Sequence, residues 1–382
     1  MHDFVVIGGG IAGASLSYFL ADFATVLLIE QERFCGHHST GRSAAVYAET
    51  YGNGIVRSLT KASRAFFDAP PPGFAAHPLL RPRGCIYIAR HDQIPSLEIR
   101  YSDNSAATRL TPAQACGSVS ILRHDYLAAA LYDPAVFDID VSALHQGFLT
   151  GAKRRGATLL TDTTVDAVER SHSDWRVRAS GQTYACKAVV NSAGAWAGHI
   201  GHLAGVPPIG FRAFRRTAML LDAHPGMALE WGPVIVDADD QFYFKVEAGK
   251  LLLSPADETP VDPCDVQPEE LDLAIGVDRL QRAAHFPVRR IAKSWAGLRS
   301  FVTDGSPVVG YDPAAPGFFW LAAQGGFGIQ TAPAMAQLAA QLARGADLSA
   351  ELMPSGFDLS SIAPRRQYQW TEPRGGAVAQ PP

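Results

Sequence analysis

Short apolar runs alternate with glycine-rich or polar segments at the start of the chain. Residues 4–7 and 26–29 are rich in β-branched and aliphatic side chains and predict strands, whereas residues 11–22 have the length and apolar spacing of a helix. A strand, a helix and a second strand in this order form a βαβ unit. This segment therefore predicts a parallel sheet covered by helices.

Later segments extend this pattern and add a second one. Asp140 is placed to cap a helix that continues towards Lys153 and is broken at Gly156. Further strands are expected at residues 157–160, 175–177 and 188–190. The strands expected for a second, more antiparallel sheet are residues 85–89, 217–222, 234–236, 242–246 and 251–254. Two kinds of sheet in 382 residues predict two domains that are interleaved along the chain.

The composition argues against several kinds of partner. Hydrophobic residues make up 47% of the chain, as in a globular protein, and the net charge of -4 would not attract nucleic acid or an anionic membrane. The five cysteines are widely spaced and form no C-x-x-C pair, which fits a reducing cytoplasm. No segment is apolar for long enough to span a bilayer. We therefore expect a cytoplasmic protein without a transmembrane segment, whose membrane contact, if any, is peripheral.

The turn after the first predicted strand carries a dinucleotide-binding pattern. Gly8, Gly10 and Gly13 match G-x-G-x-x-G, in which small residues let the backbone approach a pyrophosphate at a helix N-terminus. Glu30 ends the second strand about twenty residues further on, where a carboxylate accepts hydrogen bonds from a ribose diol. The pattern predicts a bound dinucleotide, but FAD and NAD share it.

A second glycine-rich loop lies near the other end of the chain. A predicted strand at residues 318–322 runs into Ala323-Gln-Gly-Gly-Phe-Gly-Ile-Gln330, and an alanine-rich helix is expected to begin near Thr331. The amides at the start of that helix could face the N1/O2 edge of a flavin, where negative charge accumulates on reduction. The sequence leaves open the alternative that these glycines only permit close packing.

Six stretches of the sequence are similar to one known family. They are His38-Ser-Thr-Gly-Arg-Ser-Ala-Ala45, Ser63-Arg-Ala-Phe-Phe67, His77-Pro-Leu-Leu80, residues 140–147, Trp295-Ala-Gly-Leu-Arg-Ser-Phe301 and residues 322–330. These stretches resemble the FAD-dependent D-amino acid dehydrogenases and glycine oxidase-like enzymes of the DAO family, and most of all bacterial D-arginine dehydrogenases. The resemblance extends over nearly the whole chain.

The resemblance implies a fold class and a division into domains. The fold would be α/β, with a Rossmann-like FAD-binding domain of the glutathione reductase type and an interleaved α+β substrate domain built on a mostly antiparallel sheet. The FAD-binding domain would comprise residues 1–80, 135–204 and 300–363, and the substrate-binding domain residues 81–134 and 205–299. Residues 364–382, which are rich in Pro, Gly, Arg and Gln, would form a disordered tail.

The resemblance also implies which residues surround FAD. We expect non-covalent binding, because no cysteine lies near the second glycine-rich loop. Residues 39–44 would pass beside the flavin ring and the pyrophosphate, and Val165 would bind adenine through its backbone. The expected FAD contacts are Gly8, Gly10, Ile11, Ala12, Gly13, Glu30, Gln31, Ser39, Thr40, Arg42, Ser43, Ala44, Ala45, Val165, Ala193, Gly194, Trp196, Gly297, Arg299, Gly325, Gly326, Phe327, Gly328, Ile329 and Gln330.

Oxidation of an amino acid at Cα requires its carboxylate to be held in place, and arginine can bind a carboxylate bidentately. The resemblance places Arg216 and Arg299 in this role, together with the hydroxyls of Tyr51 and Tyr243. Arg215 and Arg216 are adjacent on a predicted strand, so only one of them can enter the pocket, and spacing alone does not select it. A surface ion pair for Arg299 and ordinary half-buried positions for the two tyrosines remain open alternatives.

The expected pocket for the substrate side chain differs from that of D-arginine dehydrogenases. Gly84 stands where a carboxylate would hold the distal cation, Val46 replaces a histidine and Ala48 a threonine, which predicts a preference for neutral, apolar side chains. Glu49 could restore cation recognition if its carboxylate turned inward. The expected pocket residues are Val46, Ala48, Gly84, Val234, Val236, Gly297 and Gln330.

Together these features predict FAD-dependent oxidative deamination of a D-amino acid by hydride transfer from Cα to flavin N5, giving an imino acid and then a 2-oxo acid. No base is identified, since His124 and His145 are expected at the surface or in the core, and no metal site is expected at His37 and His38. We expect a dehydrogenase that uses a quinone or another electron carrier, with Lys250 as an oxygen-activating group left open. The alternatives are a related flavoenzyme for 2-hydroxy acids, proline-like or N-methyl amino acids, and a catalytically silent flavin-binding protein.

Overall fold

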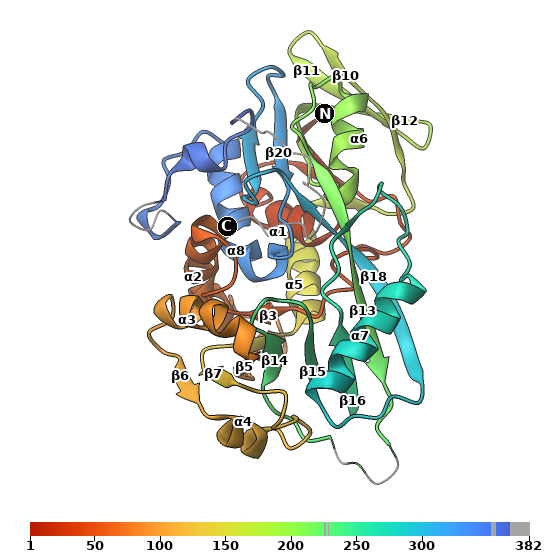
Figure 1. Cartoon of the computed structure of the whole chain (residues 1–382). Coiled ribbons are helices and arrows are strands. Elements are labelled where there is room, and N and C mark those ends of the chain that lie inside the picture. The colour runs from red at the N-terminus through yellow and green to blue at the C-terminus, as the bar shows by residue number, and fades with distance from the viewer. Residues whose placement is uncertain (225–226, 228, 353–356, 367–382) are drawn as a thin grey trace.

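A computed structural model describes residues 1–224, 227, 229–352 and 357–366 (Figure 1). The mixed α/β fold expected from the sequence is confirmed, with one large sheet in the upper half of Figure 1 and another in the lower half. Arg365 and Arg366, at the start of the expected tail, form ion pairs with Asp312 and Asp304. Residues 367–382 of that tail lie outside the described residues.

The upper sheet has eight strands and contains the expected βαβ unit. β1 (His2–Ile7) lies between β2 (Val26–Ile29) and β12 (Gln182–Asn191) and is parallel to both. All four residues of β2 are buried, which explains its continuous apolar sequence. The other strands of this sheet are β9 (Thr158–Leu160), β10 (Val165–Ser171), β11 (Asp174–Ala179), β19 (Val308–Tyr311) and β20 (Phe318–Ala322).

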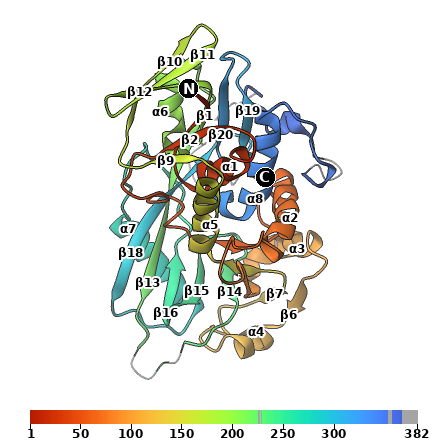
Figure 2. The same ribbon diagram turned by 180° about the vertical axis from the view of Figure 1, so that it is seen from behind.

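Helices cover both faces of this sheet (Figure 2). Phe4 and Val6 pack into the core beneath three helices, whereas Val5 and Ile7 face the opposite core, as strand alternation requires. Asp140 caps α5 as expected, because its carboxylate accepts the Ala143 N–H at 2.8 Å. α8 begins at Gly328, three residues before the expected start at Thr331, because the helix leaves the glycine-rich loop directly. The helices are α1 (Ile11–Leu20), α5 (Val141–Arg154), α8 (Gly328–Ala343) and, on the other face, α6 (Ala197–Leu203); α2 (Gly54–Asp68) packs on α8.

The lower sheet has nine strands, which are antiparallel to their neighbours except where β5 runs parallel to β14. α4 (Pro112–Ser118) and α7 (Glu270–Ala283) contribute to the core on one of its faces, and α3 (Ile94–Ser102) packs against β5 and β7. Its strands are β5 (Cys85–Ala89), β6 (Thr108–Leu110), β7 (Ala129–Asp133), β13 (Arg212–Leu221), β14 (Val234–Asp237), β15 (Tyr243–Glu247), β16 (Lys250–Ser254), β17 (Thr259–Pro260) and β18 (Ile291–Phe301).

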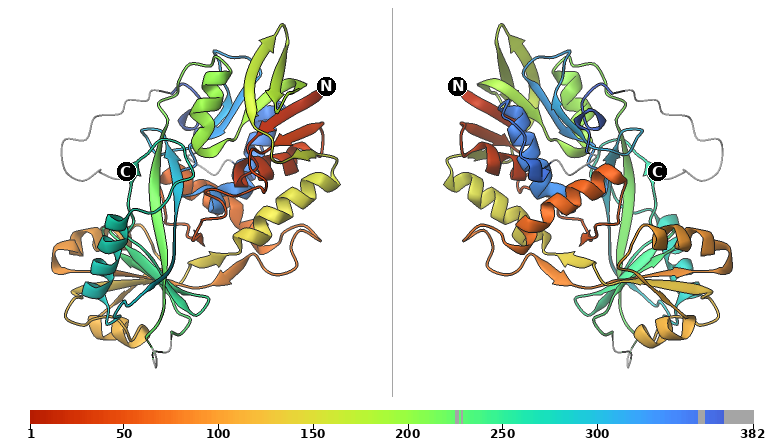
Figure 3. Two further views of the ribbon diagram at one scale, coloured as in Figure 1. Left: turned by 90° about the vertical axis from the view of Figure 1, so that its right-hand side faces the viewer. Right: turned by 90° about the vertical axis from the view of Figure 1, so that its left-hand side faces the viewer.

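The two halves of the molecule meet along long strands and a small sheet. β13 and β18 pair over almost their whole length and rise from the lower sheet towards the upper one (Figure 3). A three-stranded sheet of β3 (Val46–Tyr47), β4 (Leu80–Pro82) and β8 (Phe137–Ile139) lies apart from both large sheets. None of the helices in the described part of the chain is long and apolar enough to cross a membrane.

Candidate active site

The glycine-rich turn between β1 and α1 forms the edge of a cavity. A Cβ on Gly8, whose φ is +105°, would lie 2.6 Å from the carbonyl oxygen of Ser192, and a Cβ on Gly13 would overlap the carbonyl oxygen of Gly8. Glycine is therefore required here for the turn and for the close packing of α1 on β1. The first N–H groups of a helix have no partner within it. In the part of the chain that the structure describes, only the Ile11 N–H is taken up, by the Thr40 hydroxyl at 2.9 Å. The remaining amides can face an anion.

A buried histidine and a carboxylate hold this turn in place. Nε2 of His145, on α5, lies 2.9 Å from the carbonyl oxygen of Gly9. Burial lowers the pKa of His145, so the neutral ring is the expected donor of that hydrogen bond. Glu30, which is 8% exposed, accepts the N–H groups of Gly9 at 2.7 Å and Glu32 at 2.9 Å. Two backbone amides thus keep the Glu30 carboxylate at the cavity wall, where a ribose diol could bind.

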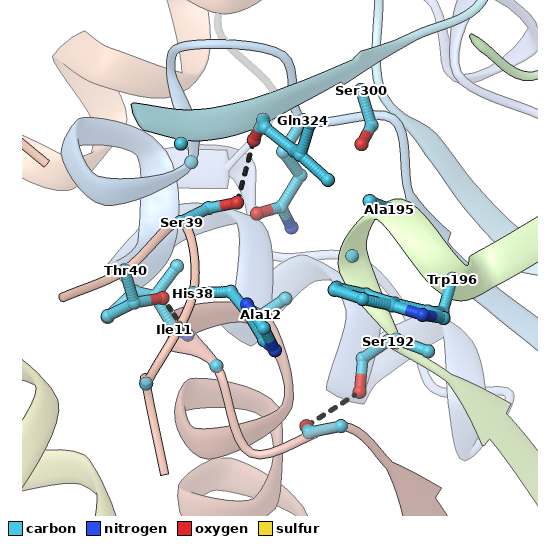
Figure 4. A pocket seen from close by; sticks show the side chains of 18 of the residues that line it. Ile11, Ala12, His38, Ser39, Thr40, Ser192, Ala195, Trp196, Ser300 and Gln324 are labelled. Carbon is cyan, nitrogen blue, oxygen red and sulfur yellow. Dashed lines mark hydrogen bonds between the residues drawn. The ribbon is translucent and has the colours of Figure 1, made fainter. Parts of the chain in front are cut away.

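The first cavity has a volume of about 410 Å³ and runs from this turn to the second glycine-rich loop. Figure 4 shows Thr40, His38 and Trp196 on its sides, with Ser300 and Gln324 further along. Of the FAD contacts predicted from the sequence, it is lined by all but Gly13, Ala45, Phe327 and Gln330. Gly13 lies in the α1 packing contact instead, and the other three line a second cavity. A dinucleotide fits the three features of this cavity: a glycine turn whose free space a side chain would fill, the N–H groups of the first helical turn, and a carboxylate held in place.

Several residues of the first cavity were missed by the sequence analysis. Ser192 follows β12, Thr163 and Thr164 follow β9, and Gln324 follows β20. These strands are parallel, so their carboxyl ends meet at one edge of the sheet. Ligands of open α/β sheets bind at that edge, and this rule was the signal that could have identified these residues.

Tertiary structure also brings Glu32 next to His37 and His38, which the sequence spacing did not indicate. One potential metal-ligand atom from each lies within 4.8 Å of the others. His38 Nε2 is already 2.9 Å from Glu32 Oε1, and the His38 ring lies 4.5 Å from that of Trp196. His37 and His38 also line the first cavity, so this cluster lies beside the groups that fit a dinucleotide.

The second glycine-rich loop is hydrogen-bonded to the end of β18. The Gly325 N–H donates to the carbonyl oxygen of Ser300 at 2.8 Å, and Gly325 has a φ of +55°. A Cβ on Gly326 would lie 2.7 Å from Cζ of Arg299. The loop therefore needs glycine at this point so that the Arg299 guanidinium can lie against its backbone.

A second cavity of about 570 Å³ adjoins the first. Both cavities are lined by the same seven residues, which form a shared wall: Ser43, Ala44, Arg216, Tyr243, Arg299, Gly326 and Ile329. Tyr51 also lines the second cavity, and Arg299 Nη1 lies 3.5 Å from its hydroxyl. The structure thus brings together the two arginines and two tyrosines that the sequence analysis selected.

The structure resolves which of the two adjacent arginines faces the cavities. Arg216 lines both of them. Arg215 points to the opposite face of β13, where it forms ion pairs with Asp257, Glu269 and Asp272. The open choice between them is therefore decided by strand alternation and by the acids that α7 and its N-cap present to Arg215.

Arg299 differs from the other cations of the second cavity. Within the described residues, each of the others contacts a carboxylate: Arg57 with Asp103, Arg100 with Asp240, Arg216 with Glu258 and Lys245 with Asp138. Arg299 has no such partner among them, and Nε of Arg216 is buried without a hydrogen-bond acceptor. Burial and the neighbouring Arg299 lower the pKa of Arg216. This shared wall therefore favours binding of an anion.

The remainder of the second cavity is mostly apolar. Val46, Ala48, Val234, Val236 and Gln330, which the sequence assigned to the substrate pocket, all line it. Gln330 Nε2 is buried without a hydrogen-bond acceptor among the described atoms, while its Oε1 accepts the Ala48 N–H at 3.2 Å. The Gln330 amide thus offers a donor beside the apolar side chains of Val46, Ala48, Val234 and Val236.

Two expected pocket positions and two alternatives are placed elsewhere. Gly297 lines the first cavity rather than the second. Gly84 lies outside the lining, with a φ of +72° at which a Cβ would be 2.8 Å from the Tyr132 ring. Glu49 also lies outside it and accepts the Tyr47 hydroxyl at 2.8 Å. Lys250 forms an ion pair with Asp222 and lines neither cavity.

Comparisons with known proteins agree with this architecture. Residues 3–342 match the family described as FAD dependent oxidoreductase (DAO). The chain is 24% identical to FAD-dependent oxidoreductase domain-containing protein 1 of Mus musculus, covering 89% of this chain and 80% of the relative. It is also 24% identical to glycine oxidase of Geobacillus kaustophilus, covering 92% and 96%. The crystal structure of that glycine oxidase superimposes with a TM-score of 0.82 over 96% of this chain and 99% of the other, at 21% identity.

Proposed function

The chain belongs to the DAO family of FAD-dependent oxidoreductases, and on this basis we propose that it is a D-amino acid dehydrogenase for substrates with neutral side chains. FAD is the cofactor, and when bound it supplies the acceptor for a hydride from the substrate Cα. The product would be an imino acid, which water converts to a 2-oxo acid.

The first cavity would hold FAD through backbone amides and one carboxylate. The first turn of α1 would face the pyrophosphate, and Glu30 would face the ribose. Ser39 and Thr40 line the same cavity, where the Ser39 hydroxyl donates to the carbonyl oxygen of Leu298 on β18. We propose non-covalent binding. No cysteine lines this cavity among the described residues, which supports that proposal.

The observation that carries the proposed function is the Arg299 guanidinium, which lies at the wall between the two cavities and has no carboxylate partner among the described residues. A substrate carboxylate would supply that partner, with the unused Nε–H of Arg216 and the hydroxyls of Tyr51 and Tyr243 as further donors. Because these groups line the cavity next to the cofactor, binding the carboxylate there would orient Cα towards the shared wall.

The walls of the second cavity support neutral side chains. A cationic side chain would need an anion. Away from the shared wall, the acids that line this cavity are Asp103 and Asp240, which are paired with Arg57 and Arg100, and Asp239, which is exposed. Glu49 points to Tyr47 rather than into the cavity. Poor oxidation of D-arginine is therefore part of the proposal, and it sets this chain apart from the D-arginine dehydrogenases that its sequence resembles.

For the electron acceptor, we propose a quinone or another carrier. An oxygen-activating role for Lys250 would require its ammonium beside the flavin, whereas it forms an ion pair with Asp222 away from both cavities. The proposal thus favours a dehydrogenase over an oxidase.

Anaerobic reduction of the FAD-loaded protein tests these proposals. Neutral D-amino acids should bleach the oxidised flavin absorbance, whereas their L enantiomers and D-arginine should not. Reduction only by 2-hydroxy acids, by proline or by sarcosine would instead identify a related flavoenzyme. If no carboxylate compound in this panel reduces the flavin, the protein is a silent flavin binder and the proposal is wrong.

A further inference from the structure

Glu258 lies beside the two arginines of the shared wall, and the proposed function leaves it without a role. It lines the second cavity and forms an ion pair with Nη2 of Arg216. The two side chains are only 23% and 11% exposed. A carboxylate in this position competes with any substrate carboxylate for Arg216, so a wholly anion-binding site would be weakened by it.

The backbone on both sides of the contact is held in place. β13 and β17 pair antiparallel with Arg215 opposite Thr259, and Glu258, directly before Thr259, forms its ion pair with the next residue of β13, Arg216. The preceding residue, Asp257, accepts the Thr217 N–H at 2.6 Å and the Thr217 hydroxyl at 3.0 Å. Glu258 is therefore held on both sides by strand pairing and side-chain hydrogen bonds, unlike an acid on a free surface loop.

The charges of the shared wall and of Glu258 beside it match a zwitterion better than a simple anion. Arg216, Arg299 and Glu258 carry two positive charges and one negative charge. Burial opposes the charged form of Arg299, and the charge of Glu258 is among the influences that favour that form. An α-amino acid presents an ammonium one carbon away from its carboxylate, so it offers a cation to the acid and an anion to the arginines at the same time.

We infer that Glu258 is a specificity-determining residue that binds the substrate ammonium. Its ion pair with Arg216 is kept, so Arg299 is the principal partner of the substrate carboxylate. This inference rests on the proposed function, since it assumes an amino acid in the second cavity. It explains why an acid is built into a carboxylate-binding wall. A 2-hydroxy acid has no charge to offer Glu258 and is disfavoured.

The test uses two ligands of nearly equal shape that cannot be oxidised because neither has an α-hydrogen. 2-Aminoisobutyrate is a zwitterion, and pivalate replaces its ammonium with a methyl group. Each is titrated into the FAD-loaded protein, and its dissociation constant is taken from the change in the flavin spectrum. Wild-type protein should bind 2-aminoisobutyrate more tightly, and Glu258→Gln should lower that preference at least about 10-fold, with pivalate binding unchanged or tighter.

Two further variants separate recognition from structure. Glu269→Gln is the matched control, because Glu269 contacts the neighbouring Arg215 on the outer face of β13 and should leave the preference unchanged. Glu258→Asp keeps the charge and should retain part of the preference, which guards against a Gln variant that folds poorly. Equal weakening of both ligands by Glu258→Gln, or no change in their ratio, would overturn the inference.

The failure of the proposed function would look different. If the wild-type protein binds the two ligands with the expected preference but no amino acid reduces its flavin, the role of Glu258 stands and the proposed oxidation is wrong. If wild-type protein binds pivalate as tightly as 2-aminoisobutyrate, or binds neither, the role of Glu258 is overturned whatever the reduction panel shows.

Discussion

Replacing Arg299 with methionine removes the one guanidinium of the second cavity that has no carboxylate partner in the described part of the chain. Methionine keeps much of the side-chain length but offers no donor. Because no acid is stranded by this change, the free protein should retain its fold; its FAD content is measured alongside, since Arg299 also lines the first cavity. The loss should therefore fall on ligand binding, which is not true of Arg216→Met.

The size of that loss follows from the remaining donors. Truncating one partner of a buried charge pair costs about 2–5 kcal/mol, or about 30-fold to several thousand-fold in affinity. Arg216 can replace little of it, since its Nη2 is held by Glu258 and only Nε is buried without an acceptor. The tyrosine hydroxyls each contribute a neutral hydrogen bond of about 0.5–1.5 kcal/mol. We expect carboxylate ligands to bind at least about 100-fold more weakly to Arg299→Met.

The assay is the flavin-monitored titration with 2-aminoisobutyrate, together with the dependence of anaerobic reduction on the concentration of the best D-amino acid. Lys293→Met is the control, because it removes one positive charge from an exposed position on the same strand. A loss of less than about threefold in Arg299→Met, or an equal loss in Lys293→Met, would refute the assignment of Arg299 as the carboxylate anchor.

Three other changes test the surroundings of the site. Arg216→Met should lower the free energy of unfolding measured in urea by about 1–3 kcal/mol, because it strands the Glu258 carboxylate, and an unchanged midpoint would contradict this. Glu30→Ala should weaken FAD binding about 10- to 100-fold in a fluorescence titration, because the two amides at the cavity wall lose their acceptor; unchanged affinity would exclude Glu30 from the FAD site. Burial lowers the pKa of His145 below its ordinary 6.5, so as the pH falls the unfolded chain takes up the imidazole proton before the folded chain does. The free energy of unfolding in urea should therefore be retained above pH 6.5 and fall as the pH drops below it. His145→Gln should reduce this dependence of the free energy of unfolding on pH.

The sequence predicted the parts of the fold that depend on local pattern. β1, α1 and β2 lie where the apolar runs placed them, and β20 spans the expected residues 318–322. The glycines between β1 and α1 could be interpreted from the sequence because only glycine can occupy a turn whose Cβ positions are filled by neighbouring backbone. The arrangement of two sheets was also within reach, since buried parallel strands and half-exposed antiparallel strands differ in their hydrophobic pattern.

The parts that escaped prediction depend on long-range contacts. Strand alternation requires Arg215 and Arg216 to face opposite sides, but the choice of side depends on where α7 packs, about sixty residues later in the chain. Glu258 gave no signal at all, because an acid beside another acid in a connecting segment is typical of exposed loops. Its ion pair with Arg216 and its place in the lining of the second cavity show that it belongs to the site.

This pairing also connects the stability of β13 to the chemistry of the cavity. On the outer face, Arg215 contacts three acids and is only 4% exposed, more counter-charge than one guanidinium needs. A shift of one residue in the β13–β17 register would exchange the two faces, turning Arg215 towards the cavities and leaving those acids unpaired. The acids around Arg215 therefore favour the β13–β17 register in which Arg216 faces the cavities and lies beside Glu258. The orientation of Arg216 thus depends on an ion-pair cluster that lies outside both cavities, and in Glu269→Gln the two remaining acids, Asp257 and Asp272, would keep it.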